Sequence, residues 1–162
     1  MATLGRAMKI GLVCLAVLVV GAVLVMREST DPVSRTAAAK TLHRVVLQVN
    51  SNDPGTMNLT LNNATNVEQY YKDLDEKVEI EVVTFGAGLH MLRDDTSPVK
   101  ERIRAIAEKT TSITFKACGN TQENMHKAEK KDIPLVSQAK LVKSGVVRIM
   151  ELQEQGWSYV RP

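Results

Sequence analysis

The pattern of apolar and polar positions divides the chain into three parts. From Ile10 to Met26, every position is apolar except Gly11 and Gly21. Residues 27–42 are mostly polar and follow no apolar period. From His43 to Pro162, short β-branched runs alternate with stretches that have the apolar period of an amphipathic helix. We therefore expect an N-terminal apolar helix within residues 1–26, a tether over 27–42 and one folded domain over 43–162.

Within the folded domain, the pattern predicts strands that alternate with helices. The strands are expected at 43–50, 78–85, 113–118, 135–142 and 157–160. The helices are expected at 57–74, from Pro98 through Ala107, over 120–130 with Asn120 as N-cap, and from the N-cap Ser144 to Gly156. Because parallel strands need crossover connections, this order predicts an α/β fold: a mostly parallel sheet of about five strands with helices on both faces.

The first 26 residues are typical of a segment that directs a chain to a membrane. Arg6 and Lys9 precede the apolar run, which is longer than the hydrophobic region of a cleaved signal peptide. The run ends in Val25-Met26-Arg27-Glu28, which offers no small-residue cleavage site. An uncleaved signal-anchor is therefore favoured over a cleaved signal peptide. We expect a domain anchored in a bacterial inner membrane through residues 10–26 and facing the periplasm, or exported to the periplasm if the segment is cleaved.

Composition and charge narrow the classes of function. The formal charge is +3, from 21 Lys and Arg against 18 Asp and Glu, and aromatic residues make up 4 %. Arg6 and Lys9 supply two of the three excess charges, so the folded domain is nearly neutral and a nucleic-acid partner is not expected. Of the two cysteines, Cys14 lies in the apolar segment. Cys118 is then the only thiol of the domain, and it has no partner there for an internal disulfide.

Ligands of open parallel α/β sheets bind beyond the carboxyl ends of the strands. Cys118 ends an expected strand just before a helix N-terminus, where the positive end of the helix dipole lowers a thiol pKa and favours the nucleophilic thiolate. It is the candidate catalytic residue, although a buried structural cysteine fits the same position. No spacing predicts a metal site, and no cofactor is expected. Candidate ligand-binding residues at the same edge of the sheet are Asn50, Gly86, Gly88, His90, Gly119 and Asn120.

Three segments, taken together, resemble the DsrE/DsrF-like family of sulfur-relay and intracellular sulfur-oxidation proteins. They are VVTFGAGLHML at 82–92, FKACGNT at 115–121, and SGV at 144–146 with the ending QGWSYVRP at 155–162. The resemblance implies a three-layer α/β/α domain, homo-oligomerisation, and a sulfurtransferase-like carrier that holds sulfane sulfur as a persulfide on Cys118. It also implies donor and acceptor proteins or small thiols as partners.

Two other functions remain open at this stage. One is a membrane-tethered, non-catalytic binding or assembly module of the same fold, in which Cys118 is structural. The other is a redox-sensing thiol that forms a disulfide between subunits.

Overall fold

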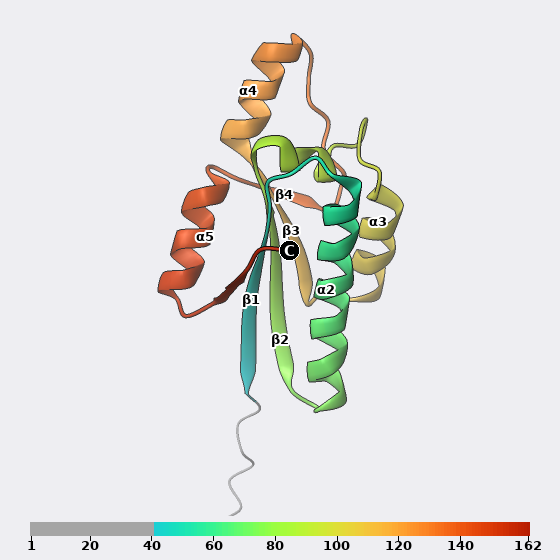
Figure 1. Ribbon diagram of the computed structural model, residues 1–162, viewed down its shortest axis with the longest axis vertical. Coiled ribbons are helices and arrows are strands. Elements are labelled where there is room, and N and C mark those ends of the chain that lie inside the picture. The colour runs from blue at the N-terminus through green and yellow to red at the C-terminus, as the bar shows by residue number, and fades with distance from the viewer. Residues whose placement is uncertain (1–40) are drawn as a thin grey trace, which may run out of the picture. The chain divides into compact units, whose positions relative to one another are not determined.

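The computed structural model describes residues 41–162, which form an α/β domain (Figure 1). The apolar segment 10–26 and nearly all of the tether over 27–42 lie outside the described residues. Among residues 41–162, no helix is both long and apolar enough to cross a bilayer. In chain order the elements are β1 (Leu42–Val49), α2 (Pro54–Asp73), β2 (Lys77–Thr84), the 3₁₀-helix η1 (Gly86–Leu92), α3 (Lys100–Lys109), β3 (Ile113–Cys118), α4 (Gly119–Glu129), β4 (Ala139–Val142), α5 (Gly145–Glu154) and β5 (Ser158–Val160).

The five strands form one sheet in the order β4-β3-β2-β1-β5, and each neighbouring pair is parallel. This confirms the α/β fold and the mostly parallel sheet expected from the sequence. In the register of the sheet, Thr84 pairs with Ala117 and Cys118 pairs with Val142. The carboxyl ends of β2, β3 and β4 therefore lie side by side at one edge of the sheet.

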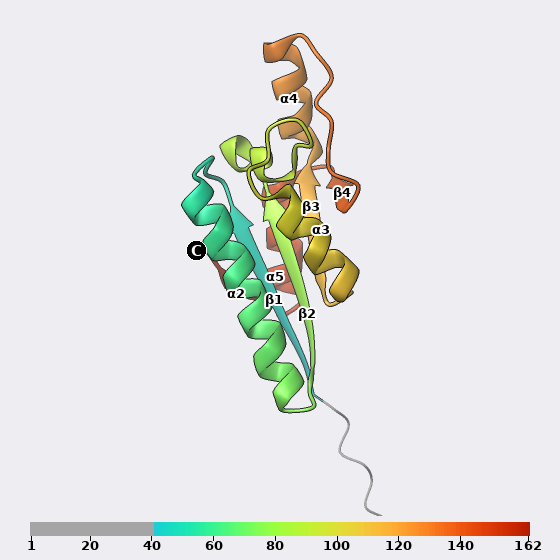
Figure 2. The same cartoon turned by 90° about the vertical axis from the view of Figure 1, so that its right-hand side faces the viewer.

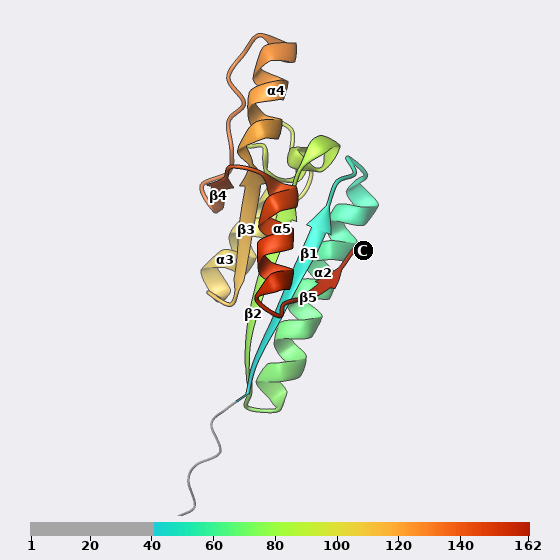
Figure 3. The same ribbon diagram turned by 90° about the vertical axis from the view of Figure 1, so that its left-hand side faces the viewer.

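Strand order and crossover handedness explain where the helices lie. The chain moves in one direction across the sheet from β1 to β4, and then returns to the far edge for β5. Right-handed crossovers put α2 and α3 on one face and, because the direction of travel reverses, α5 on the other. Figure 2 shows α2 and α3 in front of the sheet, and Figure 3 shows α5 in front of the opposite face. Helix α4 extends beyond the carboxyl end of β3 in all three views.

Alternate strand residues supply two separate apolar clusters. On the α2 and α3 face, Leu47 of β1 packs in a large cluster with Leu61 of α2 and Ile103 of α3. On the α5 face, a smaller cluster contains Val46, Val83, Ile149 and Leu152. Since successive strand side chains point to opposite faces, one sheet supplies both cores.

Three helices begin at other residues than the sequence pattern suggests. Helix α2 begins at Pro54 rather than at Met57, with Asp53 as its N-cap residue. Helix α3 begins at Lys100 rather than at Pro98, because Ser97 Oγ accepts the N–H of Val99 at 3.3 Å and closes a turn there. Helix α4 begins at Gly119, with Cys118 rather than Asn120 as its N-cap residue, so the cysteine lies two residues closer to the helix start than expected.

The segment between β2 and α3 differs most from the expectation. Residues 86–92, for which the sequence predicts neither a helix nor a strand, form the 3₁₀-helix η1. The short strand expected within 135–142 is β4, at Ala139–Val142. Directly after η1, Arg93 is 1 % exposed and its guanidinium binds both Asp95 and Glu129. Its backbone forms an isolated antiparallel bridge with Leu135. Arg93 thus fixes the segment after η1 against the end of α4 and the chain before β4.

Candidate functional site

Cys118 lies at the carboxyl edge of the sheet, beyond which open α/β sheets bind ligands. It is the last residue of β3, and its register partner Val142 is the last residue of β4. The chain continues from β3 into α4 and from β4 into α5. The candidate catalytic residue therefore lies at the edge of the sheet that the sequence indicates.

The thiol lies between the starts of two helices. Cys118 is the N-cap residue of α4, and Gly145 is the first residue of α5. A Cβ atom on Gly145 would lie 3.4 Å from Cys118 Cβ and 3.0 Å from Phe85 Cδ1. The start of α5 thus packs directly against Cys118 and Phe85, without room for a larger residue. The first N–H groups of an α-helix have no partner within the helix, so both starts bring positive potential to the sulfur.

The surroundings of Cys118 favour its ionised form. Burial by itself would raise the pKa of the Cys118 thiol, but the Thr121 hydroxyl and the N–H groups of Gly145 and Thr121 outweigh it. They hold that pKa below its ordinary value, because donors stabilise the thiolate more than the thiol. This agrees with the direction expected from the sequence. The electrostatic requirement for a nucleophilic thiol is therefore met.

Cys118 is only 4 % exposed, so its access to solvent is narrow. A cavity of about 580 Å³ lies on the side of β4 and α5, and its wall includes Val142, the register partner of Cys118, but not Cys118 itself. Lys143 and Arg148 bring positive charge to this cavity and Glu151 brings negative charge. The cavity is lined by Asn120, Val142, Lys143, Ser144, Val147, Arg148 and Glu151.

Three of the candidate ligand-binding residues lie around the thiol. Gly119 follows Cys118 directly, and the N–H of Asn120 donates to the carbonyl of Lys143 at 3.2 Å, joining α4 to the end of β4. The N–H of Gly86 donates to Thr121 Oγ1 at 3.0 Å, joining the end of β2 to α4.

The other three candidates are engaged elsewhere. Gly88 packs against the end of β1, where a Cβ atom would lie 2.2 Å from Val49 O and 2.8 Å from Asn50 Cα. His90 Nδ1 lies 2.8 Å from Thr96 Oγ1. Gly88 therefore lies against the end of β1 and Asn50, and His90 lies against the loop after η1. These contacts are not with Cys118.

The sequence predicts that the loops 118–121 and 142–145 share this edge of the sheet, but it does not single out Thr121 and Gly145 as neighbours of the sulfur. Thr121 follows Cys118 by three residues, and this spacing indicates a contact only once the cysteine is known to be the N-cap residue. Gly145 approaches Cys118 across the sheet edge, and no local pattern reveals that approach.

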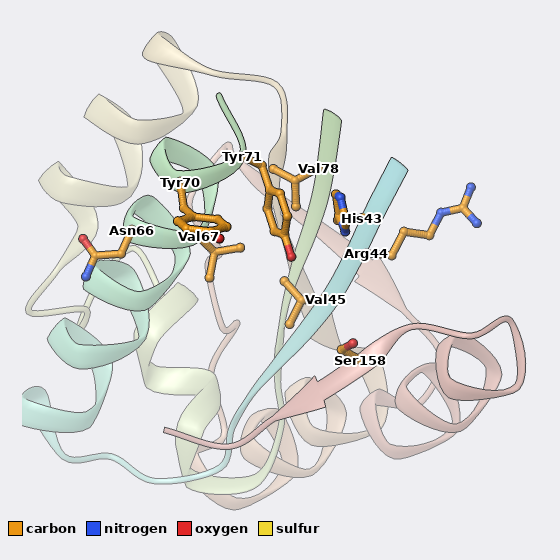
Figure 4. Close-up of a pocket in the computed structure, with 9 residues that line it drawn as sticks. All are labelled: His43, Arg44, Val45, Asn66, Val67, Tyr70, Tyr71, Val78 and Ser158. Carbon is orange, nitrogen blue, oxygen red and sulfur yellow. The ribbon is translucent and has the colours of Figure 1, made fainter. Parts of the chain in front are cut away.

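A second cavity, of about 380 Å³, lies between α2 and the amino-terminal half of β1 (Figure 4). Tyr71 stacks on His43 with the ring centroids 3.8 Å apart, and Tyr70 meets Tyr71 edge-on. His43 Nε2 lies 2.6 Å from Glu76 Oε2. The wall of this second cavity is mainly aromatic and aliphatic and contains no cysteine. It is formed by His43, Arg44, Val45, Asn66, Val67, Tyr70, Tyr71, Val78 and Ser158. Because it lies at the opposite end of β1 from the carboxyl edge, it is separate from the Cys118 site.

Within residues 41–162, no group of three or more His, Cys, Asp or Glu side chains is placed to hold a metal ion.

The fold and site together define an α/β protein with a thiol at the carboxyl edge of a parallel sheet. The chain matches no protein-family model and no curated protein. Among solved structures it is similar to MTH1491, a protein of unknown function from Methanobacterium thermoautotrophicum. The two share 30 % identity over 74 % of this chain and 99 % of that chain, with a TM-score of 0.63. The chain belongs to the same family as this archaeal protein.

Proposed function

We propose that the protein is a sulfur carrier that holds sulfane sulfur as a persulfide on Cys118. The observation that carries the proposal is the position of Cys118 at the carboxyl edge of the sheet, between the starts of α4 and α5, with donors that lower the pKa of its thiol. A carrier needs a thiolate within reach of a second sulfur, and it needs neither a metal nor a second cysteine.

The transfer follows thiol–disulfide exchange. The Cys118 thiolate attacks the terminal sulfur of a donor persulfide, R–S–SH, and a new S–S bond forms to Cys118 Sγ. The donor S–S bond breaks, and its electron pair leaves with the donor as the thiolate R–S⁻. An acceptor thiolate then attacks the terminal sulfur of Cys118–S–SH and regenerates the Cys118 thiolate. Both steps conserve sulfur oxidation state overall, so neither needs an external oxidant or reductant.

The wider setting of this proposal comes from the sequence. We propose that the protein is a member of the DsrE/DsrF-like family, with its three-layer architecture and its homo-oligomeric assembly. We also propose that residues 10–26 anchor it in a bacterial inner membrane, with the domain in the periplasm. Its partners would then be a sulfur donor and a sulfur acceptor, either proteins or small thiols.

The first prediction tests the carrier function directly. The full chain, carrying Cys14→Ala so that Cys118 is the only thiol, is incubated with polysulfide and its intact mass is measured. We expect a gain of one sulfur atom, because the Cys118 thiolate takes up a sulfane sulfur, and its loss after addition of a small thiol acceptor. The matched control, Cys118→Ser in the same Cys14→Ala background, should gain nothing. A Cys14→Ala chain whose mass stays unchanged would exclude the carrier function.

The low exposure of Cys118 favours one alternative. A thiol that is 4 % exposed also fits a packing role, in a non-catalytic binding or assembly module held at the membrane. In that case Cys118→Ser would leave the fold, the assembly and any cellular phenotype intact. A phenotype lost by Cys118→Ser with the fold retained would count against this alternative.

A further inference from the structure

Helix α5 presents an apolar stripe to solvent on the side that faces away from the sheet. Ile149 and Leu152 pack on the sheet, in the smaller of the two apolar clusters. Val147 and Met150 lie on the opposite side of the helix and are 49 % and 54 % exposed. In Figure 3 no other element of the described domain lies over this side of α5. The two apolar side chains therefore have no partner within the described residues.

The stripe carries opposite charges at its two ends. Lys143 directly precedes the N-cap residue of α5 and lines the same cavity as Val147, and Glu154 is the last residue of the helix. Positions 143, 147, 150 and 154 are separated by four, three and four residues, the spacing of one side of a helix. The side chains of Lys143 and Glu154 are exposed and form no hydrogen bond or ion pair within residues 41–162. Both charges are therefore available to a partner.

This pattern of charge is complementary to a second copy of the same helix that runs in the opposite direction. In an antiparallel pair with its two-fold axis midway between Val147 and Met150, Val147 of each copy faces the partner's Met150. Lys143 and Glu154 lie equally far beyond these two positions, so Lys143 of each copy faces the partner's Glu154. A two-fold interface uses the same surface twice and requires this kind of self-complementarity. A parallel pair would instead put Lys143 against the partner's Lys143.

We propose that two copies of this chain pair through antiparallel α5 helices, with Val147 against the partner's Met150 and Lys143 against the partner's Glu154. The inference deepens the homo-oligomeric assembly proposed above by naming its contact surface. Lys143 and Val147 also line the cavity that includes Val142, so the partner's helix forms an outer wall of that cavity. A sulfur donor that enters the cavity then contacts both subunits. This last consequence rests on the proposed sulfur-carrier function, whereas the pairing itself does not.

The length of α5 determines how the pairing is best measured. The helix has 10 residues and is therefore about 15 Å long. One face of such a helix buries less than the roughly 1,600 Å² of a standard interface, so we expect a dimer that dissociates on dilution. A covalent trap in the full chain detects such a dimer without dilution.

The second prediction uses full chains with Cys14→Ala and Cys118→Ser, so that an introduced cysteine is the only thiol. One chain carries Val147→Cys and a second chain, with a tag of different size, carries Met150→Cys. After co-expression and mild oxidation, the two chains should form a disulfide with each other, because these positions face each other across the axis. A non-reducing gel identifies the mixed dimer by its size.

The matched control places the same spacing on another exposed helix face. Chains with Asn66→Cys and Gln69→Cys on α2, co-expressed in the same way, should not link above the level of random collision. The charges are then tested within the α5 trap. Lys143→Glu in both chains replaces two attractive contacts with repulsive ones and should lower the yield of linked dimer about tenfold. Adding Glu154→Lys to both chains exchanges the charges and should restore the yield.

Equal linkage of the α2 and α5 pairs, or a yield that ignores the charge reversal, would overturn the inference. So would an oligomer whose α5 cysteines stay unlinked, because its contact surface must then be another face. Thermal unfolding of each variant checks the fold. Polysulfide uptake by the chain that retains Cys118 separates the two proposals. Linkage without uptake supports the α5 interface and removes the carrier function, whereas uptake without linkage removes only the interface.

Discussion

At the scale of single residues, two glycines that flank one turn are required for different physical reasons. Gly86 has a φ of +54°, in the left-handed region, although a Cβ atom there would meet nothing within 4 Å. Gly88 has no such φ, but its Cβ would lie 2.2 Å from Val49 O, closer than real contacts allow. Gly86 is required because of its backbone conformation, and Gly88 is required because a side chain there would clash with β1. The packing of Gly88 on β1 holds η1 in place and, with it, the segment that includes Gly86.

The third prediction concerns Gly88→Ala. The added methyl group would clash with backbone, which cannot move aside as a flexible side chain would. The free energy of unfolding should therefore fall by about 3 kcal/mol, the upper end of the cost of overpacking. Chemical denaturation of both proteins measures it. The control is Gly86→Ala, which introduces only left-handed strain and should cost about 1 kcal/mol. Equal losses in the two variants would contradict this assignment.

At the scale of elements, α5 is fixed to the sheet by an ion pair as well as by apolar contacts. Glu81 of β2 points to the α5 face and is 3 % exposed. Its carboxylate accepts from Arg148 Nε at 2.6 Å and from Arg148 Nη2 at 3.0 Å, and Lys116 Nζ lies 3.8 Å away. The pairing raises the pKa of Arg148, because hydrogen bonds to the Glu81 carboxylate favour the charged guanidinium. Arg148 lies one turn after Gly145, so this pair also holds the start of α5 against Cys118.

The fourth prediction separates the ion pair from the packing around it. Arg148→Met leaves Glu81 buried, with only Lys116 near it. It should lower the free energy of unfolding by about 3 kcal/mol, the lower end for breaking a buried pair, because Arg148 is partly exposed. The double variant Glu81→Met with Arg148→Met removes the stranded charge and should recover most of the loss. Denaturant unfolding measures both, and a double variant as unstable as the single one would contradict the argument.

Elements set by local pattern were predictable, and those set by distant contacts were not. The strand at 113–118 was predicted as found, because its β-branched run is bounded by turn residues. The start of α4 was placed too late, since cysteine is not a usual N-cap residue and Asn120 is. The pairing of Glu81 with Arg148 joins residues that are 67 positions apart, so no local pattern predicts it. Strand order has no local signal either, and it determines which residues lie beside Cys118. Cys118 itself was found because a strand end before a helix is a local feature.

At the scale of the whole chain, the sequence combines two unlike parts. The similarity to MTH1491 covers 99 % of that protein but 74 % of this one, so this chain has residues beyond the match. Its first 26 residues contain Arg6, Lys9 and no acid, followed by the apolar run 10–26. If that run is an anchor, it confines a sulfur carrier to the membrane surface. At that surface the carrier would meet its donor and its acceptor by lateral diffusion and at a raised local concentration.

The fifth prediction tests this anchor in a bacterial host. The full chain should sediment with membranes, resist a high-salt wash and be released by detergent, because hydrocarbon rather than charge holds it. Val17→Arg with Val20→Arg puts two charges into the apolar run at a cost of about 2.5–3.5 kcal/mol each, and should move the chain out of the membrane fraction. Thr3→Arg, outside the run, is the matched control and should behave as the wild type does. The intact mass of the wild-type chain, taken from whichever fraction contains it, then separates the two sequence-based alternatives. The full-length mass in the membrane fraction identifies a signal-anchor, and a mass lacking the first residues in the periplasmic fraction identifies a cleaved signal peptide. A full-length wild-type chain that is absent from the membrane fraction would exclude both.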